Sequence, residues 1–309
     1  MEDTNCCDKN FHVPVMLNEV LDSLNIKPDG IYIDLTFGGG GHSKEILKKL
    51  KTGHLYSFDQ DSDTLEYAEN LKAENFTFTH ANAIFLKRFL KYYRVEKVDG
   101  IFADLGVSSH QIDTASRGFS IRYEGPLDMR MNKNSLLTAK QILNFYSPNQ
   151  LLFIFKEYGE LTNAKALTEI VCKYRKREKF NTTQQLANLV RESFNISKNH
   201  INQYLAKVFQ SLRIEVNNEL ENLKSWLLQT SDLLKCDGRL VVLSYHSLED
   251  RIVKTFIKNG NFLDQENPFF ISQPILKTLN NKPLTPSSEE LLQNFRSSSA
   301  KLRAATKIF

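Results

Sequence analysis

Cysteine and histidine are scarce in the 309-residue sequence, and neither is spaced as a metal site. The four cysteines include no CxxC pair, and the seven histidines include no HxH or HxxxH pair. We therefore expect reduced thiols and no bound metal. No apolar run approaches the roughly 18 residues that span a bilayer, and the first residues, MEDTNCCDKNFHV, lack the apolar segment of a secretory signal. These absences predict a cytoplasmic protein without a membrane partner, and no feature predicts a protein partner.

A dinucleotide fingerprint is also missing, although four glycines stand together at residues 38–41. The pattern G-x-G-x-x-G needs its third glycine at position 43 or 44, where the chain has Ser43 and Lys44. This spacing disfavours a nucleotide-dependent oxidoreductase, which is one rival class for the protein.

Short apolar runs alternate with helical patterns in the first third of the chain. Apolar residues are 41% of the sequence, enough for one large domain or two smaller ones. We expect strands at 30–37, 54–59, 76–81 and 98–106, and helices at 42–50, 62–74 and 84–95. Strict alternation of this kind predicts an α/β fold in which a doubly wound parallel sheet has helices on both faces.

The alternation stops near Gln111 and returns after about residue 210. The segment between reads as a loop followed by helices, with no convincing strand. Afterwards we expect one long helix at 211–235, a strand at 238–247, a helix at 247–260, weaker strands at 273–280 and 301–309, and loops at 285–290 and 296–301. We therefore predict one α/β domain in two parts, 1–110 and 211–309, around an inserted helical domain at 111–210.

Charge is distributed unevenly along the chain. Residues 1–110 carry a net charge of −5 and residues 111–309 a net charge of +9, within a total of +4. The segment 173–179 is basic, and we expect Arg296, Lys301, Arg303 and Lys307 in the tail to face no acidic neighbours. This pattern predicts contacts with a polyanion such as RNA, although each residue alone also fits a solvated surface.

The glycine run follows the first expected strand, where doubly wound folds bind ligands. Glycine allows positive φ and close approach of a ligand to the backbone. Asp34 precedes the run by four positions, and its carboxylate suits a cationic ligand such as S-adenosylmethionine better than a pyrophosphate. Asp34 can also order the turn by accepting backbone N–H bonds.

Two further aspartates end neighbouring expected strands. Asp59 follows Gly40 by 19 residues, where a carboxylate can accept ribose hydroxyls, whereas Asp61 and Asp63 fit caps of the next helix. Asp104 ends the fourth strand, before a short polar stretch that could form one wall of a substrate pocket (Gly106, Ser108, Ser109 and Gln111). Asp104 either accepts a hydrogen bond from the N–H of a nucleobase amine or holds the methionyl part of a bound S-adenosylmethionine.

We expect a second wall of the substrate pocket at the end of the fifth expected strand. Tyr245 could stack on a base, and His246 could contact substrate or instead bond to the backbone. Helix capping and ion pairing are the simpler interpretation of Glu249, Asp250 and Arg251.

Eight blocks of the sequence together resemble one protein family. They are HVPVMLNEVL (12–21), YIDLTFGGGGHS (32–43), FDQD (58–61), DGIFADLGVSSHQID (99–113), RGFSIR (117–122), LDMRM (127–131), FQSLRIEVNNEL (209–220) and LSYHSLEDRIVK (243–254). The chain resembles the bacterial small-subunit ribosomal RNA cytosine-N4 methyltransferases, the MraW or RsmH family. The resemblance implies that 1–110 and 211–309 form a Rossmann-like class I methyltransferase domain, with an inserted RNA-engaging domain. It also implies S-adenosyl-L-methionine as cofactor and, as substrate, a 16S rRNA cytidine near the decoding centre of the small ribosomal subunit.

The resemblance also implies which residues form the site. Cofactor contacts carry over to Gly40, Gly41, His42, Asp59, Asp104 and Gln111, with Asp104 as the candidate catalytic residue. The family's usual aromatic residue after the third strand is replaced by Ala83, so either Ala83 lines the adenine side through its backbone or Phe85 supplies the ring.

Two rivals of other kinds remain open on the sequence alone. One is a methyltransferase for a different base or for DNA. The fourth strand ends in DLGVSS rather than the Pro-Pro-aromatic motif of many amino-methylating enzymes, so the acceptor geometry must differ from theirs. The other is a non-catalytic RNA-binding protein that retains a degenerate cofactor fold, to which Ala83 points. The methylated nucleoside would identify the first, and RNA binding without cofactor binding the second.

Overall fold

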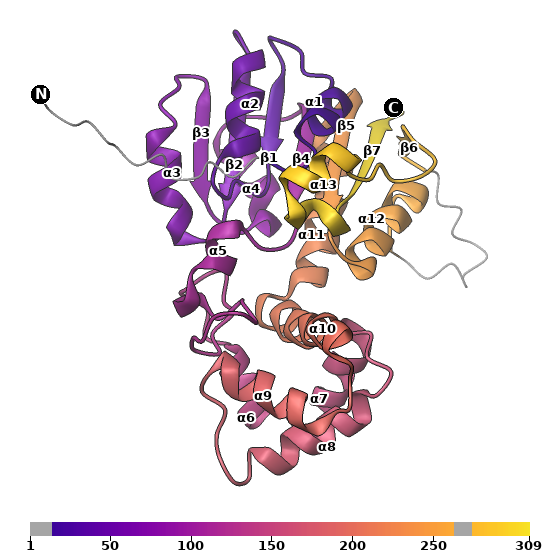
Figure 1. The fold of residues 1–309 in the computed structure, drawn as a ribbon. Helices are drawn as coiled ribbons and strands as arrows, with labels where there is room; N and C mark the ends of the chain where they lie inside the picture. The colour runs from indigo at the N-terminus through magenta and orange to yellow at the C-terminus, as the bar shows by residue number, and fades with distance from the viewer. Residues whose placement is uncertain (1–13, 263–273) are drawn as a thin grey trace, which may run out of the picture.

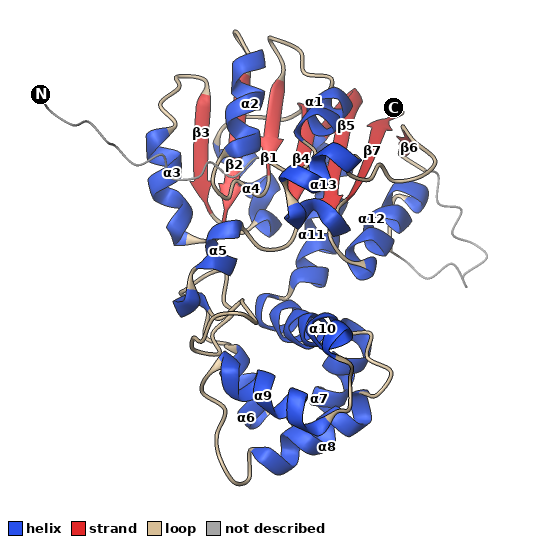
Figure 2. Cartoon of the chain, in the orientation of Figure 1, coloured by secondary structure: helices blue, strands red, loops and turns tan. Residues whose placement is uncertain are grey.

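Seven strands form one sheet with helices on both faces, as Figures 1 and 2 show. The computed structural model describes residues 14–262 and 274–309, apart from the side chains at 198, 199 and 295. The sheet order is β3-β2-β1-β4-β5-β7-β6. The strands are β1 (Ile31–Asp34), β2 (His54–Asp59), β3 (Phe76–His80), β4 (Val98–Asp104), β5 (Leu234–Ser244), β6 (Leu276–Thr278) and β7 (Lys301–Lys307). Strands β1 to β5 are parallel and β7 is antiparallel, which confirms the predicted class I methyltransferase fold.

Side chains alternate between the two faces along each central strand. Tyr32 packs with helices α1 (Leu17–Leu24) and α2 (Gly41–Lys49), whereas Ile33 packs with α4 (Leu86–Tyr92), α11 (Glu219–Leu233) and α12 (Ser247–Asn259). Both side chains are buried. Because successive residues of a strand point to opposite faces, a central strand covered on both sides reads as a continuous apolar run.

An inserted helical region lies between β4 and β5, below the sheet in Figure 1. It has its own hydrophobic core, which includes Phe155, Phe180 and Leu212. Its helices are α5 (Ser109–Asp113), α6 (Ala139–Phe145), α7 (Pro148–Phe153) with a π-helical turn (Ile154–Tyr158), α8 (Ala164–Tyr174), α9 (Thr183–Ser193) and α10 (Lys198–Asn217). The boundary expected at residue 210 falls within α10. We keep the division into parts as a proposal.

The long helix expected at 211–235 is wrong, because the structure has two helices there. Asn218 has a φ of 50°, in the left-handed region, and separates α10 from α11. Asparagine adopts this conformation more readily than most residues, because its short polar side chain bonds to nearby backbone.

The loops expected in the C-terminal region are also partly helical. Ser287 caps α13 (Ser288–Gln293), and a 3₁₀ turn spans Phe295–Ser299.

The remaining elements agree with the sequence analysis. The two weaker strands are present as β6 and β7, and the second helix of the alternation is a 3₁₀ turn (Ser62–Thr64) followed by α3 (Leu65–Asn70). Cys172 and Cys236 are free thiols, whereas Cys6 and Cys7 lie outside the described residues. Within the described ranges, no helix is long and apolar enough to cross a membrane.

Candidate active site at the carboxyl edge of the sheet

Three aspartates end adjacent strands and meet at one edge of the sheet. Asp34, Asp59 and Asp104 are the last residues of β1, β2 and β4, which are neighbours in the order β2-β1-β4. Parallel strands bring their carboxyl ends to the same edge, so the expected convergence of the three follows directly. The site therefore rests on residues that lie at or near the ends of the expected strands.

Asp34 and Asp59 both hold the glycine turn in place. Asp34 is buried and accepts hydrogen bonds from the Thr36 N–H at 3.1 Å and the Ser43 hydroxyl at 2.7 Å. Asp59 accepts from the N–H of Gly38 at 2.8 Å and from the N–H of Asp61 at 2.9 Å. Each oxygen of Asp59 retains acceptor capacity for a ligand, because a carboxylate oxygen has two lone pairs.

The glycines of the turn have different reasons for lacking a side chain. Gly40 has a φ of 75°, and a Cβ there would lie 2.7 Å from the Phe37 ring. A Cβ on Gly39 would meet no atom of the described chain within 4 Å. Folding therefore requires Gly40, whereas Gly39 leaves open space beside the turn, where a ligand can approach the backbone.

The three carboxyls have raised pKa values because burial disfavours their charged forms. Burial raises the pKa of Asp34 and of Asp59 to about 6, and that of Asp104 to about 7. No lysine or arginine among the described residues pairs with any of the three. A group of desolvated carboxyls without a cation partner fits a ligand that carries positive charge.

Asp104 is held between a tyrosine and a histidine. The Tyr245 hydroxyl donates to Asp104 Oδ1 at 2.7 Å, and His42 Nδ1 lies 3.8 Å from Oδ2. His42 Nε2 donates to the carbonyl of Val15 at 3.0 Å, and burial lowers the pKa of His42 to about 4, so the imidazole is neutral. Sequence reasoning placed Tyr245 in the opposite wall but missed its bond to Asp104.

Gln111 takes part in a buried network with Asp61, which lies just after β2. Its side-chain amide donates to Asp61 Oδ2 at 2.6 Å, and its carbonyl oxygen accepts from the Ser108 N–H at 3.0 Å. Arg117 donates to the same Asp61 oxygen at 2.7 Å and also pairs with Asp63. Asp61 does cap the 3₁₀ turn, as expected, but the buried guanidinium of Arg117 was missed.

Ala83 and Phe85 flank the site on the side of β3. Asn82 donates to the side-chain oxygen of Gln60 at 2.7 Å, which ties this segment to the loop after Asp59. Ala83 is partly buried against the core, whereas the Phe85 side chain is 45% exposed. The assignment of the adenine-side contact stays a prediction.

His246 belongs to a second cluster near the same edge. It caps α12, where its Nδ1 accepts from the Glu249 N–H at 3.5 Å. Ligand atoms of Glu219, His246 and Glu249 lie within 4.8 Å of one another, the only such group in the described ranges. Arg213 already occupies both carboxylate oxygens of Glu219, at 2.9 and 3.0 Å. This pairing accounts for Glu219 without an ion, and the absence of a metal stays a prediction.

The expectation that the tail cations face no acidic groups is wrong. Arg296 pairs with Asp113 at 2.6 Å, and Arg303 pairs with Asp250 at 2.6 Å. Lys301 lies 3.8 Å from Asp250, and Lys307 is buried and donates to the carbonyls of Ser231 and Leu234. The sequence shows only neighbours along the chain, whereas the sheet places β7 beside β5, with α12 packed against it. The tail therefore uses these charges within the fold.

Comparisons with known proteins identify the family of this chain. A profile described as the MraW methylase family matches residues 9–308. The chain belongs to this family. The protein of Amoebophilus asiaticus named ribosomal RNA small subunit methyltransferase H is 52% identical, over 99% of this chain and 99% of its own length. The protein of the same name from Cytophaga hutchinsonii is 48% identical, over 96% and 99%. Among solved structures, an rRNA methylase from Streptococcus thermophilus matches at 13% identity over 95% of this chain and 92% of its own, with a TM-score of 0.38.

Proposed function

We propose that the protein methylates N4 of a cytidine in small-subunit (16S) ribosomal RNA, near the decoding centre, with S-adenosylmethionine as cofactor. The observation that carries the proposal is the group of three carboxyls with raised pKa values beside an open glycine turn. Family membership and the names of two full-length relatives support small-subunit ribosomal RNA as the substrate class. The partner is then the small ribosomal subunit, and the site of action is the cytoplasm.

The residues at the carboxyl edge fit this cofactor. Gly40, Gly41 and His42 form the turn that opens α2. The N–H of Gly40 donates to the carbonyl of Phe37 at 2.8 Å, whereas those of Gly41 and His42 lie in the first turn of the helix, where N–H groups lack an intrahelical acceptor and can bind a ligand. We assign Asp59 to the ribose hydroxyls, Gln111 to the support behind it through Asp61, and Ala83 to the adenine side. The cofactor supplies a methyl group activated by a sulfonium charge, which uncompensated carboxylates attract.

Asp104 is proposed as the group that prepares the attacking amine. The lone pair of cytosine N4 is delocalised into the ring, so the amine is a weak nucleophile. Asp104 accepts a hydrogen bond from N4–H and takes up the proton that N4 gives up during transfer. A carboxyl with a pKa raised to about 7 suits this task at neutral pH. The bond from Tyr245 positions Asp104, and neutral His42 places no competing cation beside it.

Methyl transfer to small ribosomal subunits tests the proposal. Subunits that lack the modification are incubated with cofactor labelled in its methyl group, and the RNA is digested to nucleosides. We expect the label in N4-methylcytidine, and none when the subunits already carry this modification. Label in another nucleoside would overturn the substrate. Absence of both transfer and cofactor binding would instead favour a non-catalytic RNA-binding protein.

A further inference from the structure

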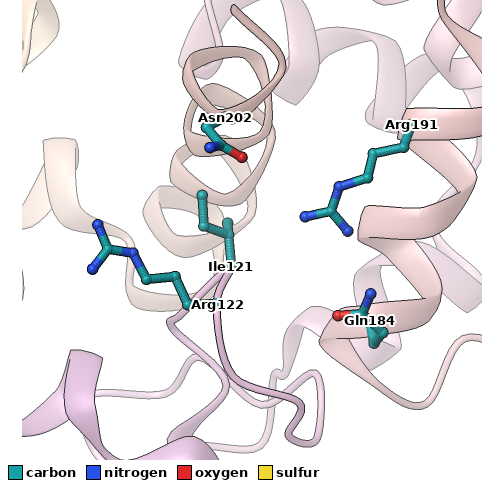
Figure 3. Close-up of a pocket in the computed structure, with 5 residues that line it drawn as sticks. All are labelled: Ile121, Arg122, Gln184, Arg191 and Asn202. Carbon is teal, nitrogen blue, oxygen red and sulfur yellow. The ribbon is translucent and has the colours of Figure 1, made fainter. Parts of the chain in front are cut away.

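A polar pocket lies within the inserted helical region, apart from the sheet. It has a volume of about 340 Å³ and is lined by Ile121, Arg122, Gln184, Arg191 and Asn202. Figure 3 shows these side chains coming from the loop before α6, from α9 and from α10. Gln184 and Arg191 are seven residues apart on α9, so two helical turns place them on the same face.

The pocket lining carries positive charge without a carboxylate. Arg122 is exposed, and its guanidinium has no hydrogen bond or ion pair to any described residue. Arg191 donates to Asn188 Oδ1 at 3.3 Å, and Gln184 donates to the same oxygen at 2.7 Å. Asn188 thus orients both side chains, while most of the donors of the two arginines stay available for a ligand.

Arginine without a carboxylate partner is the side chain best suited to phosphate. Its planar fork of N–H donors matches two oxygens of a phosphate group, and its charge is permanent. The carboxamides of Gln184 and Asn202 add neutral donors and acceptors, and Ile121 offers apolar contact for a ribose or base. The lining therefore fits a phosphodiester with its attached sugar better than a lone inorganic ion.

The surroundings of the pocket favour a nucleic-acid strand. Gln185, at the start of α9, donates to Glu178 at 2.6 Å, so the basic segment 173–179 lies beside this helix. In that segment Arg175 is committed to the carbonyls of Leu143 and Tyr146. The tail cations are committed elsewhere within the fold. The inserted region, with its two pocket arginines, is therefore better placed than the tail to contact a polyanion.

We propose that this pocket binds the backbone of the substrate RNA strand, with Arg122 and Arg191 each contacting a different phosphate. The inference rests on the proposed function, because it takes RNA as the substrate class. Such contacts hold the strand in register without reading its sequence. The pocket then fixes where the RNA lies, while the carboxyl edge of the sheet selects the base.

The double variant Arg122→Gln with Arg191→Gln tests this assignment by direct RNA binding. Affinity for a short single-stranded oligoribonucleotide is measured against salt concentration, a readout that needs no methyl transfer. Each phosphate contact contributes roughly 0.7 to the slope of log affinity against log salt for single strands. We expect the slope to fall by about 1.5 and the affinity to fall by about tenfold or more. A slope and affinity equal to those of the unchanged protein would overturn the proposal.

A matched variant and a second ligand complete the experiment. Arg88→Gln with Lys91→Gln removes the same charge from exposed positions on α4, so we expect a smaller loss than in the pocket variant. A loss of equal size would overturn the proposal, because it would reflect net charge alone.

Titration with inorganic phosphate tests for a free-ion site, and saturable phosphate binding with unchanged RNA affinity would also contradict the assignment. Cofactor affinity should be unaltered in both variants. If RNA binding behaves as expected but subunits are not methylated, the proposed function fails and the pocket stands.

Discussion

Single residues at the carboxyl edge derive their chemistry from burial. Asp34, Asp59 and Asp104 share high pKa values because the fold removes water from them without supplying a basic partner. Asp59 is predictable as the end of the expected strand 54–59. Asp34 and Asp104 lie within the expected strands 30–37 and 98–106, which the structure ends at these two residues. The partners of Asp104 were not predictable, because Tyr245 reaches it from 141 positions away, through the pairing of β4 with β5.

Replacing Asp104 with asparagine should impair turnover more than cofactor binding. Asn retains an acceptor for the Tyr245 hydroxyl but cannot take up a proton from the amine. We expect kcat to fall by about 100-fold or more, in line with loss of a general base, and cofactor affinity to change by much less. Single-turnover methyl transfer and calorimetry measure the two effects separately.

Tyr245→Phe is the matched variant for this prediction. It removes only the hydroxyl that positions Asp104, so we expect a smaller loss of kcat. The hydrogen bond from Tyr245 lowers the pKa of Asp104, so its removal should move the rise of rate with pH to higher pH. A loss of cofactor affinity in Asp104→Asn, with kcat at saturating cofactor unchanged, would show that Asp104 holds the methionyl part instead.

Within the glycine turn, the fold constrains the four residues to different degrees. The sequence shows four glycines but not which of them the fold requires. In the structure, Gly40 has positive φ and a close aromatic neighbour, whereas Gly39 has neither.

The break between α10 and α11 was unpredictable for a related reason. One left-handed residue, Asn218, interrupts a segment whose helical pattern continues on both sides.

Two alanine substitutions in this turn should have different effects. Gly40→Ala forces a Cβ to within 2.7 Å of Phe37 at a left-handed position. We expect it to lower the free energy of unfolding by roughly 1–3 kcal/mol. Gly39→Ala should leave the free energy of unfolding within about 0.5 kcal/mol of the original but weaken cofactor binding, because its methyl group occupies the open space. Denaturant unfolding and calorimetry test the pair. Unchanged cofactor affinity in Gly39→Ala would contradict the role given to the turn.

At the scale of the molecule, a buried ion network joins the sheet to the inserted region. Arg117 pairs with Asp61 and donates to the carbonyls of Arg130 and Met131 at 2.8 and 3.2 Å. The N–H of Met131 in turn donates to Asn217, at the end of α10, at 2.7 Å. The existence of an inserted helical region was predictable from its lost alternation. These cross-links were not, because nothing local marks Arg117 as buried.

Arg117→Met should destabilise the protein because it leaves the Asp61 carboxylate buried without its cation. Breaking a buried ion pair by removing one partner costs about 3–5 kcal/mol. Lys133→Met, which removes the partly exposed partner of Asp63, should cost less than about 1 kcal/mol. Denaturant unfolding of both variants measures the difference. Equal and small losses would show that the network does not stabilise the junction.

The central claim is that the carboxyl edge of the sheet binds a cationic cofactor, and the most direct test is cofactor affinity against pH. The carboxyls of Asp34 and Asp59 are neutral below their raised pKa values of about 6 and charged above them. Calorimetry between about pH 5.5 and 7.5 should therefore show affinity for S-adenosylmethionine rising with pH. S-adenosylhomocysteine, which lacks the sulfonium charge, should show a shallower rise. Affinity that is constant or falls over this range would contradict the account.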